Sequence, residues 1–213
     1  MARLSQLSKN DSVAILGSGF GYYGYLKTIL KYKEFKIIIQ KNRAHKIQNV
    51  SDEKKIHLET YKNIKNLFKY IIIAKRPIDQ KKIIEDVIQI NKNKVLFLEN
   101  PLCENPKKSL KILNLLIKHN ISFRINYIFL YTNWFKQLKR MGYSKNKKII
   151  LKWNFTNKDT NSWKFKKIYG GGIIRYYGIQ IIAILSILGF DKCIKSKVTK
   201  NKNKKYSWYA TFK

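Results

Sequence analysis

The sequence contains few cysteines and few histidines. Its two cysteines, Cys103 and Cys193, stand far apart in 213 residues, so neither a disulfide framework nor a cysteine metal site is predicted. The three histidines, His45, His57 and His119, show no metal-ligand spacing. We therefore expect no metal, and reduced thiols of this kind are typical of a cytoplasmic protein.

Long hydrophobic runs are also missing. The first ten residues are polar, without the apolar centre of a signal peptide. The most apolar segment, 178–190, is shorter than the roughly 20 residues that cross a bilayer, and Gln180 and Ser186 interrupt it. We expect this segment to be a buried helix, and we expect no membrane partner.

Acidic residues are scarce, since 12 Asp and Glu stand against 45 Lys and Arg and give a formal net charge of +33 at pH 7. Such a balance suggests a polyanionic partner such as nucleic acid. Nearly all the basic residues are lysines, however, and they are spread along the chain. Together with abundant Ile and Asn, this favours AT-rich codon usage over a nucleic-acid surface. On either interpretation the positive field attracts phosphorylated ligands.

Short apolar runs alternate with helix-like segments up to residue 126. Hydrophobic residues make up 45% of the chain, which is typical of a globular protein. The alternation predicts an α/β fold with a parallel sheet and helices on its faces. Five runs have the length and composition of strands covered on both faces, namely 13–16, 35–39, 70–74, 95–98 and 122–126.

Helix ends are marked by particular residues. Pro77 precedes an apolar stripe at 83, 84, 87 and 88. Asn105 is expected to cap a helix that starts at Pro106, and Asn120 suits the end of that helix. The polar stretch 42–66 shows no clear pattern.

After residue 126 the pattern changes. We expect a helix in 127–141, a strand in 148–155, and two weak strands at about 195–199 and 206–212. The chain is therefore divided into residues 1–126 and 127–213.

A glycine-rich segment follows the first strand, Gly17-Ser18-Gly19-Phe20-Gly21. A strand, such a turn and a helix start form the arrangement that binds a dinucleotide pyrophosphate. Gly17 would permit the tight turn, and Gly19 would let the backbone approach the phosphates. The third glycine of the usual spacing would fall at Tyr22, whereas Gly21 stands one place early. The alternative is a structural turn in a domain that has lost its ligand.

The end of the second strand bears on the choice of dinucleotide. NAD enzymes usually carry an acid there, which binds the ribose hydroxyls. This chain has no acid at that point, and Lys41 and Arg43 stand there instead. Two cations favour the 2′-phosphate of NADP over NAD, although a chain so rich in lysine also offers Lys41 by chance.

Several further motifs, in order along the chain, resemble those of the Gfo/Idh/MocA oxidoreductases, named for glucose-fructose oxidoreductase and inositol dehydrogenase. The resemblance covers about residues 11–190. Residues 71–77 are similar to the family's third strand and Pro-containing turn, and residues 95–102, with Glu99-Asn100-Pro101, are similar to its Glu-Lys-Pro motif. Asn126-Tyr127 is similar to the Asn-Tyr pair of the family. Residues 171–180 are similar to the family's helix start with its Gly-Gly, Asp, Gly, His pattern.

This resemblance implies a Rossmann-type NAD(P)-binding domain in residues 1–126. A shortened α/β (α+β) domain with mainly antiparallel strands would follow in residues 127–213. The family's second domain commonly carries the substrate face and a subunit interface, so the resemblance also implies a homo-oligomer. The residues implied for NADP or NAD are Gly17, Ser18, Gly19, Phe20, Gly21, Lys41, Arg43, Ala74, Lys75, Pro77, Glu99 and Asn126.

The family's catalytic positions correspond here to Glu99, Asn100, Tyr176 and Gln180. Asn100 replaces a Lys, Tyr176 an Asp and Gln180 the acid–base His. Asn forms hydrogen bonds but does not titrate, so the usual proton transfer lacks its groups. Tyr176 is expected to pack against the sheet, or else to donate a proton with help from a cation such as Arg175.

Three functions remain open on the sequence. The leading hypothesis is a cytoplasmic NAD(P)-dependent oxidoreductase that acts on a sugar or sugar nucleotide, by analogy in bacterial surface-polysaccharide biosynthesis. The second is a non-catalytic nucleotide-binding sensor or scaffold, which the three substitutions favour. The third is a basic nucleic-acid-binding protein, which only the charge supports.

Overall fold

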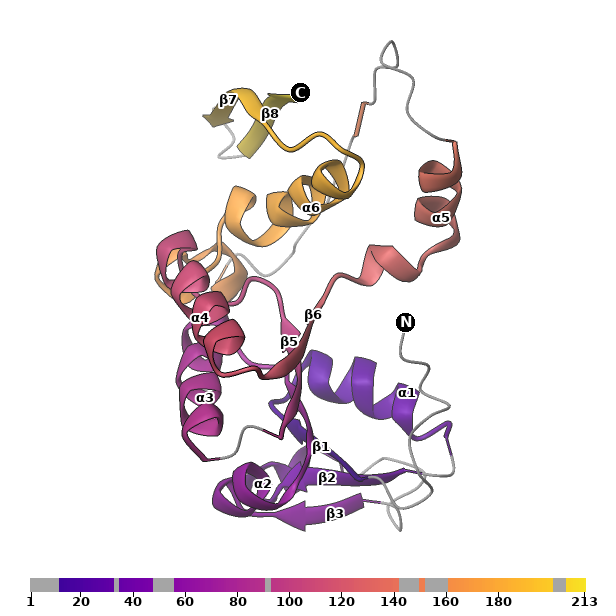
Figure 1. Ribbon diagram of the computed structural model, residues 1–213, viewed down its shortest axis with the longest axis vertical. Coiled ribbons are helices and arrows are strands. Elements are labelled where there is room, and N and C mark those ends of the chain that lie inside the picture. The colour runs from indigo at the N-terminus through magenta and orange to yellow at the C-terminus, as the bar shows by residue number, and fades with distance from the viewer. Residues whose placement is uncertain are drawn as a thin grey trace. The chain divides into compact units, whose positions relative to one another are not determined.

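A computed structural model of the chain describes residues 12–32, 35–47, 56–90, 93–141, 150–151, 161–200 and 206–213. The chain divides into two compact units, 1–126 and 127–213. The first contains a six-stranded parallel sheet with helices, and the second contains short helices and a two-stranded antiparallel sheet (Figure 1). This architecture confirms the predicted fold class, a Rossmann-type domain followed by a smaller α/β domain.

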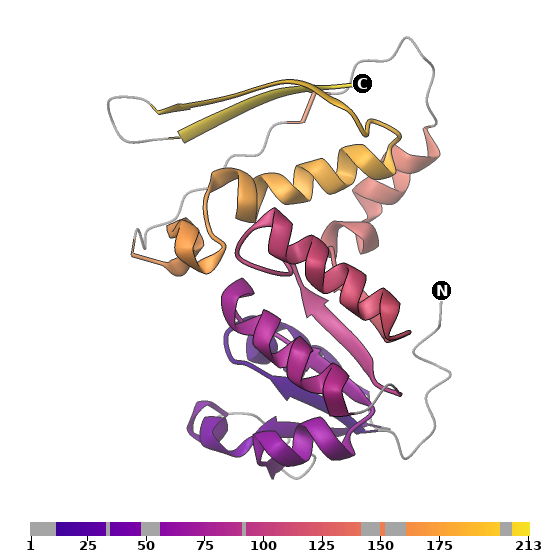
Figure 2. The same cartoon turned by 60° about the vertical axis from the view of Figure 1, so that its left-hand side comes forward.

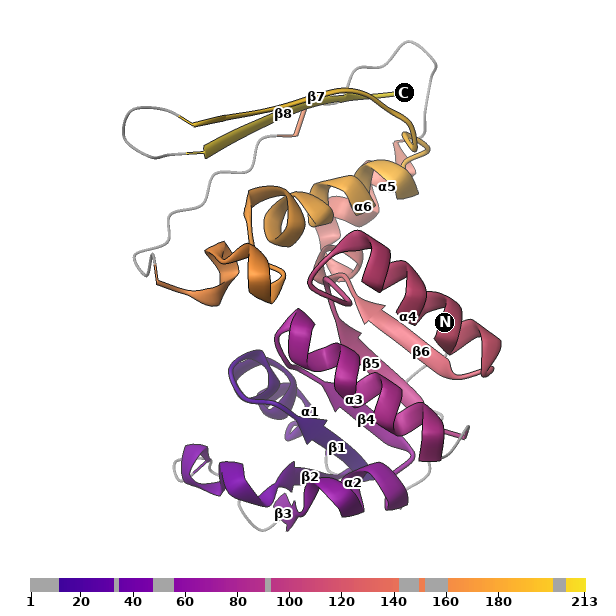
Figure 3. The same cartoon turned by 90° about the vertical axis from the view of Figure 1, so that its left-hand side faces the viewer.

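The parallel sheet has the strand order β3-β2-β1-β4-β5-β6 (Figure 3). Its order reverses between β1 and β4, and open α/β sheets bind ligands outside the carboxyl ends of the strands at such a point. Leu16 of β1 pairs with Ile73 of β4, and Glu99 of β5 with Asn126 of β6. The strands are β1 Ser12–Leu16, β2 Lys36–Gln40, β3 Ile56–Glu59, β4 Tyr70–Ile73, β5 Val95–Glu99 and β6 Ser122–Asn126.

Five of these strands match the predicted runs, and β3 was missed. Its residues His57 and Leu58 are exposed because β3 is an edge strand, paired only with β2. The buried apolar run that reveals a central strand is therefore absent. The short helix α2, Tyr61–Leu67, was missed as well, although Thr60 caps it by accepting a hydrogen bond from the Asn63 N–H at 3.2 Å.

Alternate residues of each strand face two separate layers. Leu16, Ile73 and Leu98 pack with α2, α3 (Pro77–Ile90) and α4 (Pro106–Lys118) on one face. Ile15 and Ile39 pack with the helix that follows β1 on the other face. The two views in Figures 2 and 3 show α3 and α4 side by side on the same face of the sheet.

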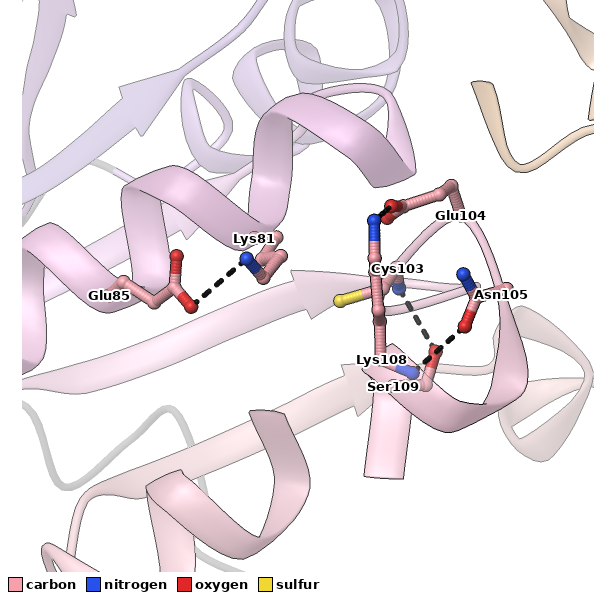
Figure 4. A network of polar contacts seen from close by, with 7 residues as sticks. All are labelled: Lys81, Glu85, Cys103, Glu104, Asn105, Lys108 and Ser109. Atoms are coloured by element: carbon pink, nitrogen blue, oxygen red, sulfur yellow. Dashed lines mark hydrogen bonds and ion pairs between the residues drawn. The ribbon is translucent and has the colours of Figure 1, made fainter. Parts of the chain in front are cut away.

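The start of α4 follows the sequence signals closely (Figure 4). The side-chain oxygen of Asn105 accepts a hydrogen bond from the Lys108 N–H at 2.9 Å, which confirms the predicted cap. Ser109 Oγ accepts one from the Cys103 N–H at 3.1 Å, and the Lys108 ammonium pairs with Glu104. Past the end of α4, Asn120 adopts a positive φ of 51°, which suits a helix terminus.

The second unit consists of short elements. The helix expected in 127–141 is a 3-10 turn followed by α5, and the two weak strands are the hairpin β7–β8. The strand expected at 148–155 lies outside the described residues apart from Ile150 and Leu151, which are not in a strand. The elements are Ile128–Tyr131, α5 Asn133–Arg140, turns Trp163–Phe165 and Lys167–Tyr169, a π-helix Ile173–Gly178, α6 Ile179–Ile187, β7 Cys193–Lys200 and β8 Tyr206–Phe212.

The apolar helix α6 is buried only in part. Ile184, and Leu188 just past its end, form a small core with Phe129 and Phe135, but most of its other side chains are half-exposed. By length and composition the run Lys167–Ile187 would suffice to cross a membrane, yet core helices of soluble proteins meet the same criteria.

Candidate functional site

The turn after β1 depends on two glycines with different surroundings. Gly17 has φ +124°, and a Cβ there would lie 2.0 Å from the carbonyl oxygen of Ala74 at the end of β4. Gly19 has φ +67°, and nothing lies within 4 Å of its ideal Cβ position. Gly17 therefore closes the turn against the neighbouring strand, while Gly19 leaves open space at the backbone, as a bound pyrophosphate requires.

The helix after this turn explains why the third glycine stands one place early. It begins as a π-helix, Gly21–Leu26, and continues as α1, Lys27–Ile29; a π-turn holds more residues than an α-turn. A Cβ on Gly21 would lie 3.2 Å from side-chain atoms of both Ala74 and Ile15. Gly21 thus provides the close helix–sheet packing expected of the third glycine. Tyr22 instead packs against the core on the β1–β2 side of the sheet.

Two cations lie at the carboxyl ends of neighbouring strands. Arg43, in the 3-10 helix Lys41–Lys46 after β2, is half-buried, whereas Lys41 is exposed. Lys75 follows β4 and is half-buried; burial, and next the Arg43 guanidinium, lower the pKa of its ammonium. Arg76 is paired with Asp79 at 2.7 Å. Of the two cations predicted after β2, only Arg43 turns inward.

Glu99, at the end of β5, is held by groups from two other elements. The Tyr25 hydroxyl donates a hydrogen bond to Glu99 Oε1, and Asn126 Nδ2 donates another at 3.1 Å. Burial raises the pKa of this carboxyl above its ordinary range, although both hydrogen bonds oppose the rise. The structure therefore brings Glu99 and Asn126 together, and it adds Tyr25, which sequence reasoning missed because 74 residues separate it from Glu99.

Gln80 of α3 fixes the loop that follows β5, and it was also missed. Its side chain is fully buried and bonds the backbone of Glu99 in both directions, with a third bond to the carbonyl of Leu102 at 3.2 Å. Helix α3 starts at the buried Pro77, so Pro77 helps to place Gln80. A signal was present, because Gln80 precedes the apolar positions 83 and 84 by three and four residues and thus lies on the buried stripe.

Asn100 is nearly buried and takes part in backbone structure. Its Nδ2 donates to the main-chain carbonyl of Asn126, and its bond to Pro101 is cis. This amide links the ends of β5 and β6. The position of the family's Lys is therefore held by a hydrogen-bonding group that does not titrate.

Tyr176 and Gln180 lie four residues apart in the second unit, on the helical run that starts at Ile173. The Tyr176 ring makes edge contacts with Trp163 and Tyr177, at centroid distances of 5.1 and 4.9 Å, and Lys164 Nζ lies 5.5 Å from its centroid. Tyr176 thus packs among aromatic side chains of its own unit, whereas the packing against the sheet that was expected stays a prediction.

Gln180 lines a mainly apolar cavity of about 500 Å³ in the second unit. Phe129, Trp134 and Ile184 are among its other walls. Within the described part of the chain, no cluster of three or more His, Cys, Asp or Glu suits a metal ion.

Solved structures resemble this chain in fold at low sequence identity. An NAD-binding protein from Listeria innocua matches with a TM-score of 0.68 at 16% identity, covering 96% of this chain and 64% of its own. The WlbA (WbpB) dehydrogenase from Thermus thermophilus, solved with NAD and alpha-ketoglutarate, gives 0.67 and 14%, over 95% of this chain and 70% of its own. A super-repressor mutant of Gal80p from Saccharomyces cerevisiae gives 0.66 and 12%, over 94% and 60%.

These likenesses confirm the fold of the Gfo/Idh/MocA oxidoreductases that the motifs predicted. No protein-family model and no curated protein matches the sequence. The chain spans 64% of the length of the Listeria protein.

Proposed function

We propose that this chain is a Gfo/Idh/MocA-type protein that binds NADP(H) at the carboxyl edge of its parallel sheet. The observation that carries the proposal is the turn after β1, where Gly17 closes against Ala74 at the end of the neighbouring strand β4 and Gly19 is open. Arg43 and Lys75 follow β2 and β4 at the same edge. A cradle that a Cβ would fill, next to half-buried cations, fits an anionic dinucleotide.

Each residue of this edge has a defined task in the proposal. Gly17, Ser18, Gly19 and Gly21 form the pyrophosphate turn. Phe20 supports it, because its ring contacts Tyr25 at 5.1 Å and fills the space beside Gly24. Arg43 and Lys75 bind phosphate, and Lys41 adds an exposed charge. Ala74 and Pro77 line the edge and position the cofactor beside Glu99 and Asn126.

When bound, the nicotinamide would exchange a hydride with a carbon of a sugar or sugar nucleotide. In this chain Glu99 is the one catalytic candidate with a titratable carboxyl, and burial raises its pKa above the ordinary value, which favours the protonated form. Asn100 would orient the substrate or the loop by hydrogen bonding. Tyr176 and Gln180, which stand at the family's other catalytic positions, are proposed to bind substrate. We place this activity in the cytoplasm, with surface-polysaccharide biosynthesis as the proposed setting.

A non-catalytic nucleotide sensor is the second candidate, and a specific observation favours it. Asn100 donates to a backbone carbonyl and Tyr176 packs among aromatic rings, so two of the substituted positions serve the structure. The same fold is found in Gal80p, whose solved form is a super-repressor mutant.

Two measurements test these proposals. Fluorescence titration with NADPH and NADH should show binding of both, with NADPH tighter. If neither dinucleotide binds at millimolar concentration, both candidate functions are excluded. If a cofactor binds, incubation of NADPH that carries a labelled hydride with a panel of keto nucleotide sugars separates them, because only an enzyme transfers that hydride to the carbonyl carbon, giving the labelled alcohol and NADP+.

We also propose a homo-oligomer formed through the β7–β8 hairpin. Ile194, Val198 and Tyr209 on this hairpin are exposed. Light scattering should then give a mass above one chain, and replacement of Ile194 and Tyr209 by Ser should return it to that of one chain.

DNA binding that disappears with modest salt would mark non-specific charge attraction only.

A further inference from the structure

Two buried polar atoms next to the glycine turn have no hydrogen-bond partner within the described residues. They are the hydroxyl of Tyr22 and Nε of Arg43. Tyr22 lies in the first turn of the helix after β1, and Arg43 in the 3-10 helix after β2. A buried donor without an acceptor is costly in the free protein, so a pair of them at one edge indicates a missing acceptor.

The three groups in question influence one another through their charges. The Arg43 guanidinium acts on the titration of both Tyr22 and Lys75. Burial, which outweighs this effect, raises the pKa of Tyr22 to about 12, so the phenol remains a neutral hydrogen-bond donor at physiological pH. The chain thus presents a hydroxyl, a guanidinium and an ammonium from three different elements. Among the described residues, the acid that acts on Lys75 is Asp79, which is itself paired with Arg76.

A compact anion with several oxygens would provide acceptors for both donors and would balance the charge of Arg43 and Lys75. A phosphate monoester has three such oxygens and carries up to two charges. In a dinucleotide-binding sheet, the end of β2 receives the adenosine ribose, whereas the pyrophosphate lies at the turn around Gly19. The position of Arg43 after β2 therefore points to a phosphate on the ribose.

We propose that Tyr22 is a specificity-determining residue, which donates its hydroxyl to the 2′-phosphate of NADP beside Arg43 and Lys75. This inference rests on the proposed dinucleotide function. The proposal also accounts for the early third glycine. Because Gly21 provides the helix–sheet packing, position 22 can carry a side chain that reaches the phosphate.

The test is the substitution Tyr22→Phe in the full chain, with Tyr23→Phe as the matched control. Tyr23 is the next residue and is 59% exposed. Phe keeps the ring that packs in the core and removes only the hydroxyl. Affinity for NADPH should fall about tenfold in Tyr22→Phe, as expected for a lost hydrogen bond to a charged group, with affinity for NADH unchanged. Tyr23→Phe should change neither.

A second readout excludes a merely structural role. Removing a buried hydroxyl that lacks a partner should raise the melting temperature of the free Tyr22→Phe protein, while its NADPH affinity falls. In Tyr22→Phe, competition of 2′-AMP with NADPH should weaken, whereas competition of 5′-AMP with NADPH should stay the same. This difference separates a ribose 2′-phosphate from other phosphates. An unchanged NADPH-to-NADH ratio, or an equal loss for both, overturns the role of Tyr22 and leaves the proposed function standing. Absence of binding to either dinucleotide in the unmodified chain overturns the proposed function itself.

Discussion

The side chain of Gln80 exchanges two hydrogen bonds with the backbone of Glu99. The Glu99 N–H donates to Gln80 Oε1 at 2.9 Å, and Gln80 Nε2 donates to the Glu99 carbonyl at 2.8 Å. A side-chain amide thereby acts like a neighbouring strand at the point where β5 ends. Because Glu99 carries the carboxyl of the candidate site, this pairing links the core of α3 to the position of that carboxyl.

Replacement of Gln80 by Met should destabilise the protein. Met fills a similar volume but leaves a buried N–H and two buried carbonyls without partners, at a cost of about 3 kcal/mol in the free energy of unfolding. Urea unfolding measures this change. Gln89→Met, at an exposed position of the same helix, is the control and should stay within about 0.5 kcal/mol. Equal stability of the two variants would show that the pairing contributes nothing.

Replacement of Glu99 by Gln should alter how stability depends on pH. The folded-state pKa of Glu99 is raised by burial. Its contribution to stability is thus fully present below the unfolded pKa of about 4.3 and is lost as pH rises through the folded value. Gln does not titrate and still offers an oxygen to Tyr25 and Asn126. The melting temperature of Glu99→Gln should therefore gain on the unmodified protein between pH 4 and pH 8.

The control for this pH series is Glu85→Gln. Glu85 pairs with Lys81 at the surface of α3, at 3.3 Å (Figure 4), and such pairs contribute little. Its difference from the unmodified protein should stay small at every pH. A difference for Glu99→Gln that is flat or declines towards pH 8 contradicts the raised pKa.

The two glycines of the turn should respond differently to alanine. Gly17→Ala places a methyl against the Ala74 carbonyl and should prevent stable folding. Gly19→Ala meets no atom and should cost only the backbone strain of a positive φ, about 1–2 kcal/mol. Its methyl would occupy the space proposed for the pyrophosphate, so NADPH affinity should fall by at least about tenfold.

Gly189→Ala provides the matched control for Gly19→Ala. Gly189 also has a positive φ, +83°, with nothing within 4 Å of an ideal Cβ, but it lies in the second unit. It should lose similar stability in thermal unfolding and keep its NADPH affinity. Retained affinity in Gly19→Ala would place the dinucleotide elsewhere.

Lys94 is a buried cation, 2% exposed, that caps the end of α2. Its ammonium donates to the carbonyls of Asn66 and Phe68 at 3.0 and 2.7 Å. Lys94→Met should remove both bonds and cost about 2 kcal/mol of unfolding free energy. Lys82→Met, at an exposed position of α3, should be nearly neutral when measured in the same urea series.

Much of the first unit could be read from the sequence, because its central strands are apolar on both faces. The runs around Ile15, Ile38, Ile72 and Leu96 are buried in the structure as that pattern predicts. Edge strand β3 was not predicted, because it is only partly covered and so lacks the apolar run of a central strand. In the second unit, the apolar composition of α6 predicted burial, but composition does not state which neighbours enclose a helix.

The site divides in the same way. The glycine turn, Arg43 and Glu99 were predicted because each follows a recognisable strand. The partners of Glu99 were not, since Tyr25 and Gln80 reach it through tertiary contacts that leave no local pattern. Tyr22 was noticed only as a break in the glycine spacing, and its buried hydroxyl is visible only in three dimensions.

The hairpin β7–β8 touches the helical run at Gly178, where a Cβ would lie 3.0 Å from the Trp208 ring. Gly178 stands between Tyr176 and Gln180, within the segment that resembles the family's catalytic helix. Steric fit alone thus favours a bare backbone there, since a methyl group would press on the Trp208 ring. A glycine at this position has a packing reason that is independent of redox chemistry, so its presence is no guide to whether turnover survives.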